Sequence, residues 1–258
     1  MTNRERMLAA VRGEPVDRVA FVPRIEFWHR AQLRKGTLPR ELRGSSRMEM
    51  ADRLGVGHYA IVPDFTESTD RERADRALGI VRHRTLPFTT ELDGVERRVI
   101  ALGQRTAVEY VTPVGTVRTE ALFTDEMLDG GASDPHVSEY AIQKPADFAA
   151  VGYIFEHARV EADYRGMEEA RARVGERGVV VAYASSQAGP VHHIMAELMR
   201  VEDFFYAMAD EPALVERLVE QMEGYYARIE ACAAACPAEV VLYGANYDDS
   251  ITHAAFFR

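Results

Sequence analysis

The sequence predicts an α/β fold of the (β/α) TIM-barrel type, incomplete within its 258 residues. Short apolar runs, typical of strands buried on both faces, alternate with longer stretches of helical periodicity. This alternation favours a parallel sheet with right-handed crossovers, in a barrel or an open doubly wound sheet. No run is followed by a glycine-rich phosphate-binding motif, which favours the barrel. A complete barrel needs eight strands, and the chain has room for about four beside its other elements.

Four apolar runs are the expected parallel strands, and they cover residues 18–26, 58–64, 178–184 and 239–243. The first helix is expected from Asn3, as its cap, to about Arg12. Further helical patterns cover residues 46–54, 145–157, 164–174, 190–199, 201–208 and 212–235. Each strand thus has helical sequence on at least one side, as a βαβ arrangement requires.

The pattern changes between residues 79 and 123, where β-rich segments are separated by turn signals. Asp93-Gly94 is typical of a hairpin, and residues 113–115 supply another turn. The expected strands of this region are residues 79–86, 95–102, 106–112 and 116–123. We therefore predict one domain over residues 1–258, with an antiparallel β meander inserted at about 79–123.

Composition and charge exclude some classes of partner. The formal net charge is −10 and the isoelectric point is about 5.4, which argues against nucleic acid because phosphate binding needs a basic surface. No apolar run approaches the roughly 20 residues that cross a bilayer, and the amino terminus has no secretory signal, so a cytoplasmic location is expected. Cys232 and Cys236, four apart in a helical pattern, are interpreted as packing residues. A metal-binding pair is the alternative, and a disulfide is disfavoured in the cytoplasm.

Residues 3–19, NRERMLAAVRGEPVDRV, resemble the opening of uroporphyrinogen decarboxylase superfamily proteins. In that family a first helix leads through a Gly-x-Pro-x-Asp-Arg-x-Pro turn into the first barrel strand, and here Ala20 replaces the last proline. The resemblance continues in residues 188–195, 210–215 and 244–249. The superfamily contains true decarboxylases, which act on tetrapyrroles, and zinc-dependent methyltransferases that serve corrinoid proteins. It therefore implies a barrel enzyme with a small-molecule substrate.

Departures from the family pattern favour methyl transfer over decarboxylation. The decarboxylases carry an Arg-Gln-Ala-Gly-Arg run for substrate carboxylates, whereas residues 29–34 here read HRAQLR. Asp64 matches their aspartate after the second strand, but their later tyrosine has no counterpart. The methyltransferase branch resembles this chain in its long β-rich insertion. It would imply zinc and a corrinoid protein, with zinc ligands expected beyond Arg258. A third hypothesis is an inactive or partner-dependent half-barrel that forms a homodimer or associates with the missing half.

Candidate site residues are those at the carboxyl ends of the expected strands, where barrel active sites lie. The candidate catalytic residues are Asp64, His192 and His193. The candidate substrate-binding residues are Arg24, Glu26, Trp28, His29, Arg30, Asn246 and Asp248. No metal ligand is assigned.

Each of these candidates has a structural alternative. Arg24 and Glu26 could form an ion pair, and Asp64 could cap a turn. Only one of the two adjacent histidines is expected to face the cleft, since neighbours on a helix point in different directions. Asn246 and Asp248 could belong to a solvated turn.

Overall fold

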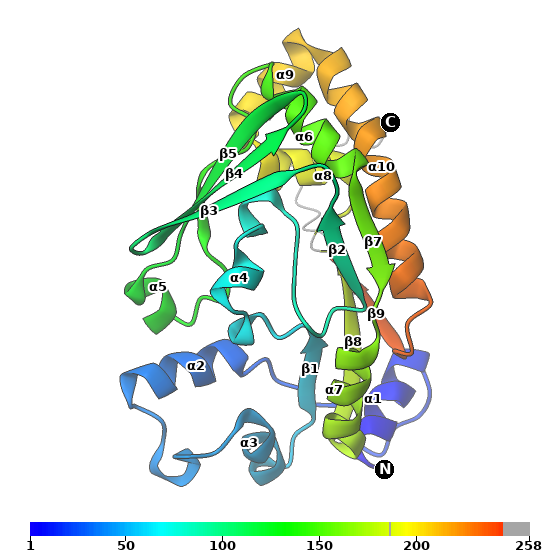
Figure 1. Ribbon diagram of the computed structural model, residues 1–258. Helices are drawn as coiled ribbons and strands as arrows, with labels where there is room; N and C mark the ends of the chain where they lie inside the picture. Colours follow the sequence, from blue (N-terminus) through cyan, green and yellow to red (C-terminus); the bar gives the residue numbers. More distant parts are fainter. Residues whose placement is uncertain (186, 245–258) are drawn as a thin grey trace.

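The computed structural model describes residues 1–185 and 187–244, which form a mixed α/β fold with three sheets (Figure 1). The first is parallel, in the order β1-β8-β9: His58–Val62, Gly178–Ser185 and Val240–Tyr243. The second pairs β2 (Phe88–Leu92) with β7 (Ala158–Ala162) in antiparallel fashion. The third is an antiparallel meander of β3 to β6: Glu96–Leu102, Arg105–Thr112, Gly115–Leu122 and His136–Glu139. The α/β class is confirmed, but no sheet of this part of the chain closes into a barrel.

Helices lie around these sheets. Those before the meander are α1 (Asn3–Arg12), α2 (Glu26–Lys35), α3 (Arg47–Leu54) and α4 (Asp70–Arg73). Those that follow it in the chain are α5 (Asp125–Asp129), α6 (Asp147–Glu156), α7 (Arg165–Val174), α8 (Pro190–His193), α9 (Val201–Asp210) and α10 (Pro212–Ala234). Short 3-10 turns η1 to η4 cover Arg40–Leu42, Phe65–Glu67, Arg76–Leu78 and Gly175–Arg177, and a π-helical turn η5 covers Ile194–Leu198. Across the described ranges, no helix has the length and apolar character needed to traverse a bilayer.

Strand β8 lies at the centre of the parallel sheet, and every residue along it except Val181 is buried. Val180 and Ala182 pack with α7 in a small cluster on one face, while Tyr183 joins the larger core on the other. Alternation of side chains along a strand produces this division. The predictions of parallel strands at residues 58–64, 178–184 and 239–243 are therefore confirmed.

The predicted strand at residues 18–26 was wrong. The segment before Glu26 has no regular strand pairing, and Glu26 begins helix α2. Val19 and Phe21 are 83% and 63% exposed, so the run is not buried on both faces. One backbone hydrogen bond, from Gly57 N–H to the Phe21 carbonyl, holds the segment near the start of β1. The segment is apolar as a buried strand would be, but no neighbouring strand covers it.

The first helix covers the predicted residues, but Thr2 and not Asn3 caps it. The Thr2 hydroxyl accepts a hydrogen bond from the Glu5 N–H, and the Glu5 carboxylate accepts one from the Thr2 N–H, which completes a capping box. The Asn3 amide instead donates to the Val56 carbonyl. The cap thus lies one residue earlier because Glu5 is three residues after Thr2.

The meander is confirmed over β3, β4 and β5, but its borders differ from the prediction. Residues 79–86 form no strand, and β6 extends the sheet to Glu139. The Asp93-Gly94 turn does not close a hairpin, because β2 pairs with β7 while β3 pairs with β4. The turn therefore passes the chain from one sheet to another.

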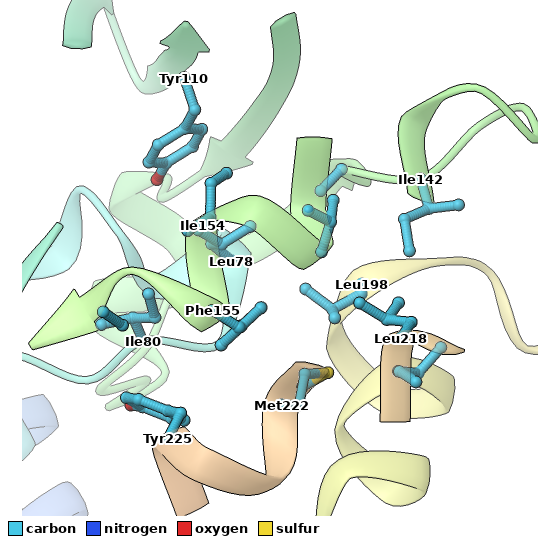
Figure 2. Packing of buried hydrophobic residues seen from close by; sticks show 14 of the residues in the cluster. Leu78, Ile80, Tyr110, Ile142, Ile154, Phe155, Leu198, Leu218, Met222 and Tyr225 are labelled. Carbon is cyan, nitrogen blue, oxygen red and sulfur yellow. The ribbon is translucent and has the colours of Figure 1, made fainter. Parts of the chain in front are cut away.

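A single large core joins the meander to the helices (Figure 2). Tyr110 of β4, Phe155 of α6 and Met222 of α10 are buried members of one cluster. Beside it, the fully buried Asp75 accepts a hydrogen bond from the Tyr110 hydroxyl at 2.9 Å and pairs with the guanidinium groups of Arg82 and Arg97. This carboxylate therefore fastens the segment before β2 to strands β3 and β4.

The two cysteines belong to different clusters. Cys232 lies in α10 against the large core, whereas Cys236 lies beyond the helix end, in the small cluster with α7. The prediction that both thiols share one helix face was wrong, because α10 ends at Ala234. Both thiols are free, and each packs against apolar side chains, which supports the packing interpretation.

Candidate functional site

A cleft of about 840 Å³ lies along strand β1 and brings together half of the predicted site residues. Four successive residues from His58 to Ile61 line it, although their side chains alternate between the faces of the sheet. The cleft therefore follows the outer edge of β1, which among the described strands pairs only with β8. Helices α2, α3 and α7 supply further walls.

Helix α2 contributes three of the predicted residues, and Arg24 lies two residues before its start. Arg24 pairs with Glu26 at 3.0 Å, and its guanidinium lies over the rings of Phe27 and Tyr59 at 5.1 and 5.2 Å. The buried His29 donates from Nε2 to the Ser45 carbonyl at 3.0 Å. Arg24 and His29 thus line the cleft, and one polar atom of each side chain is already engaged within the protein.

Arg30 differs from Arg24 in having no carboxylate within ion-pair distance in the described part of the chain. It donates to the Ala132 carbonyl at 3.0 Å, and its guanidinium lies 5.9 Å from the Phe123 ring centre. Burial, and next the charges of Arg73 and Arg34, lower the pKa of Arg30 from its ordinary value. Arg30 remains a cation, but one whose charge is poorly compensated, and an anion in the cleft would relieve this.

Asp64 lies just past β1, at the edge of the cleft as predicted. Its Oδ1 accepts hydrogen bonds from the Thr66 N–H at 3.0 Å and hydroxyl at 2.6 Å, so it caps the turn Phe65–Glu67. Its other oxygen pairs closely with Arg47 of α3. The turn cap, which was the structural alternative for Asp64, is therefore present, and the carboxylate charge is already neutralised.

The two predicted histidines lie away from the cleft. His193 is fully buried, donates from Nε2 to the Leu78 carbonyl at 3.1 Å and accepts at Nδ1 from the Tyr226 hydroxyl at 2.9 Å. Burial lowers the pKa of His193 to about 4, so it is neutral at pH 7. With both ring nitrogens engaged in the core, His193 has a structural role.

His192 is half-buried and belongs to a polar cluster at the start of α8. The Ala188 N–H lies 3.5 Å from its Nδ1. The π-helical turn that follows brings Glu197 within 3.1 Å of the Arg76 guanidinium and 2.7 Å of the Gln187 amide. Burial lowers the pKa of His192. The cluster is distinct from the cleft, since none of these residues lines it.

One further predicted residue in the described part of the chain, Trp28, does not line the cleft. The Trp28 side chain is 41% exposed. Asn246 and Asp248 lie outside the residues that the structure describes, so their assignment stays a prediction.

Sequence reasoning missed several lining residues, among them Arg47, His58 and His83. Burial, and next the charge of Arg47, lower the pKa of His58 to about 4, so His58 is neutral at pH 7. His58 stands at the start of β1, whereas barrel sites are expected at the carboxyl ends of strands. Arg47 directly follows Ser46, which caps helix α3. As a basic residue at a helix start that sequence analysis had located, it could have been suggested as the ion-pair partner of Asp64.

The site offers no metal centre in the part of the chain that is described, where no group of three His, Cys, Asp or Glu side chains is arranged to hold an ion. The surroundings of the cleft carry mixed charge and several hydrogen-bond donors, which suits a small polar ligand. Comparison with known proteins found no matching family model, no matching curated protein and no matching solved structure.

Proposed function

We propose that this chain is part of an enzyme of the uroporphyrinogen decarboxylase superfamily, and that its cleft binds a small molecule bearing a carboxylate. Arg30 carries the proposal, because it lines an 840 Å³ cleft and has no carboxylate partner among the described residues. The positive charges of Arg73 and Arg34 also repel that of Arg30 and lower its pKa. A carboxylate ligand would supply the missing counter-charge and bind a guanidinium with favourable geometry.

Of the two reactions, we favour methyl transfer over decarboxylation. A decarboxylase-like role would need Asp64 to stabilise a cation developing on the substrate. The Asp64 charge is instead engaged by Arg47, and its other oxygen holds Thr66. The long antiparallel meander also supports the methyl-transfer branch, in which the resemblance leads us to expect an insertion of this kind.

Zinc does not fit the described residues, since they contain no suitable ligand group. We therefore assign no step to a metal, and the corrinoid protein stays a prediction.

The carboxylate proposal predicts that Arg30→Gln weakens the binding of succinate, a simple dicarboxylate probe, by about tenfold or more. The substitution removes the charge but keeps much of the length of the side chain. Isothermal titration calorimetry of the full chain measures the affinity. Arg12→Gln is the matched control, because Arg12 is an exposed helical arginine outside the cleft. Equal affinities for wild type and Arg30→Gln would refute the assignment.

The reaction itself is tested with the full chain. Transfer of a methyl group from methylcobalamin to a thiol, with release of the thiol proton, is the expected result. Formation of coproporphyrinogen from uroporphyrinogen would instead favour the decarboxylase alternative. Absence of both activities, together with absence of succinate binding, would contradict the enzyme proposal.

A second candidate is a half-barrel that depends on a partner for its function. The outer edge of β1 has no strand neighbour in the described ranges, and Val19 and Phe21 beside it are exposed. The unpaired N–H and C=O groups of an open sheet edge can pair with a strand of another chain, so such an edge favours association unless it is covered. Light scattering during size-exclusion chromatography tests this candidate, and a monomer that turns over substrate unaided would exclude it.

A further inference from the structure

The cleft extends onto both faces of strand β1. On one face Tyr59 lies under the guanidinium of Arg24, close to α2. On the other face Ala60 belongs to the small cluster with Val174 of α7. Side chains alternate along a strand, so His58 shares the face of Ala60. Figure 1 shows α2 and α7 on opposite sides of β1, and the cleft thus has an α7 side that the proposed function does not use.

His58 is a half-buried histidine of this α7 side, and its ring is open to a ligand. Neither ring nitrogen has a hydrogen-bond partner among the described residues, and neither is shielded from solvent. By contrast, the buried His29 and His193 both direct Nε2 at a carbonyl oxygen. The neutral His58 ring can carry its proton on either nitrogen, so a ligand can select the tautomer that donates to it.

Arg173 is the second open group on the α7 side. It is an exposed residue near the end of α7, and it lines the cleft with His58. Within the described ranges its guanidinium has no carboxylate at ion-pair distance and donates no hydrogen bond. Its positive charge is close enough to lower the pKa of both His58 and Arg47. An uncompensated cation therefore stands beside an unengaged imidazole.

The other cations around His58 already have carboxylate partners. Arg47 pairs closely with Asp64. Arg177 pairs with Asp52 at 2.9 Å. The charge of Arg173 thus remains as a single positive excess on this side of the cleft, which suits a ligand group with one negative charge.

We propose that Arg173 and His58 form a second anion-binding position in the cleft, which takes a carboxylate group of a small molecule. Arg173 supplies the counter-charge and a guanidinium that suits carboxylate oxygens. His58 donates one ring N–H to the same group. The position is separate from that of Arg30, because Arg30 belongs to α2 on the other side of β1. It also lies at the amino end of β1, away from Asp64.

Nitrogen-resolved NMR of the full chain reports on this position directly, because the His58 nitrogen shifts change when a ligand selects a tautomer. The probe is sodium acetate at pH 7, compared with sodium chloride at the same ionic strength. We expect a saturable acetate response at His58, and Arg173→Gln to weaken the affinity read from it by about fivefold or more. Arg173→Lys keeps the charge and is expected to retain much of the affinity. Arg171→Gln is the matched control, since it removes a positive charge from the same helix outside the cleft.

The outcomes separate this position from the one at Arg30. An equal response to chloride, or an acetate affinity that Arg173→Gln and Arg171→Gln change equally, overturns the assignment. Loss of the His58 response in Arg30→Gln overturns it as well, because the two positions would then not be separate. A response that persists in Arg30→Gln and is weakened in Arg173→Gln supports the second position, whether or not succinate binds at Arg30.

Discussion

Replacing Asp75 with asparagine is expected to destabilise the protein by about 3 kcal/mol, because it leaves two guanidinium groups without their buried counter-charge. Asp75 is fully buried, and Arg82 and Arg97 both pair with it. Asparagine has nearly the same shape and can still accept from Tyr110, so the loss reports the charge and not a cavity. The free energy of unfolding in urea measures the effect.

Glu96→Gln is the control for this substitution. Glu96 pairs with Arg98 at 2.9 Å on the surface of the same meander, where both side chains are exposed. An exposed ion pair contributes little, so the change in unfolding free energy is expected to be much smaller than that caused by Asp75→Asn. If the two variants have equal stability, Asp75 does not fasten the meander to the core.

Replacing Gly79 with alanine is expected to cost about 3 kcal/mol, from backbone strain and from a clash with His193. Gly79 has φ +72°, and a Cβ built there would lie 1.9 Å from His193 Nε2. The ring cannot move without losing its contacts to Leu78 and Tyr226. Thermal unfolding followed by circular dichroism, with urea titration, measures the loss.

Gly13→Ala separates the two causes. Gly13 has the same φ of +72°, but no atom lies within 4 Å of the position that a Cβ would occupy there. It therefore reports backbone strain alone, of about 1 kcal/mol. The difference between the variants measures how firmly His193 is held. A Gly79→Ala loss no larger than that of Gly13→Ala would contradict a rigid structural role for His193.

The sequence predicted correctly those elements in which the local pattern of apolar residues agrees with the burial that the structure shows. The run at β8 is apolar on both faces, and α7 and the large core do cover both faces. The run at residues 18–26 has the same local pattern, but it lacks a strand neighbour, and Glu26 begins helix α2, which ends at Lys35. Apolar composition alone does not distinguish these cases, because strand formation depends on a partner elsewhere in the chain.

The candidate site could be predicted where a residue directly follows a strand end, as Asp64 follows β1. Arg30 also lines the cleft, but it was nominated from the expected strand at residues 18–26, and the structure places it on helix α2 instead. His83 was missed because residues 79–86 were expected to form a strand of the meander, and its approach to the cleft depends on the irregular path from η3 to β2. His193 was nominated from its position after β8, yet the chain turns its ring into the core against Tyr226. Nothing in the local sequence specifies that direction.

The outer edge of β1, unpaired within the described chain, affects which ligands the cleft can distinguish. A molecule seated along it meets main-chain amide and carbonyl groups as well as side chains, since consecutive residues of this strand border the cavity. Substitution by any residue other than proline leaves these peptide groups in place. The part of the ligand affinity that comes from the peptide groups would therefore persist when the sequence changes. Substitutions of the surrounding arginines and histidines would instead change which compounds bind in the cleft.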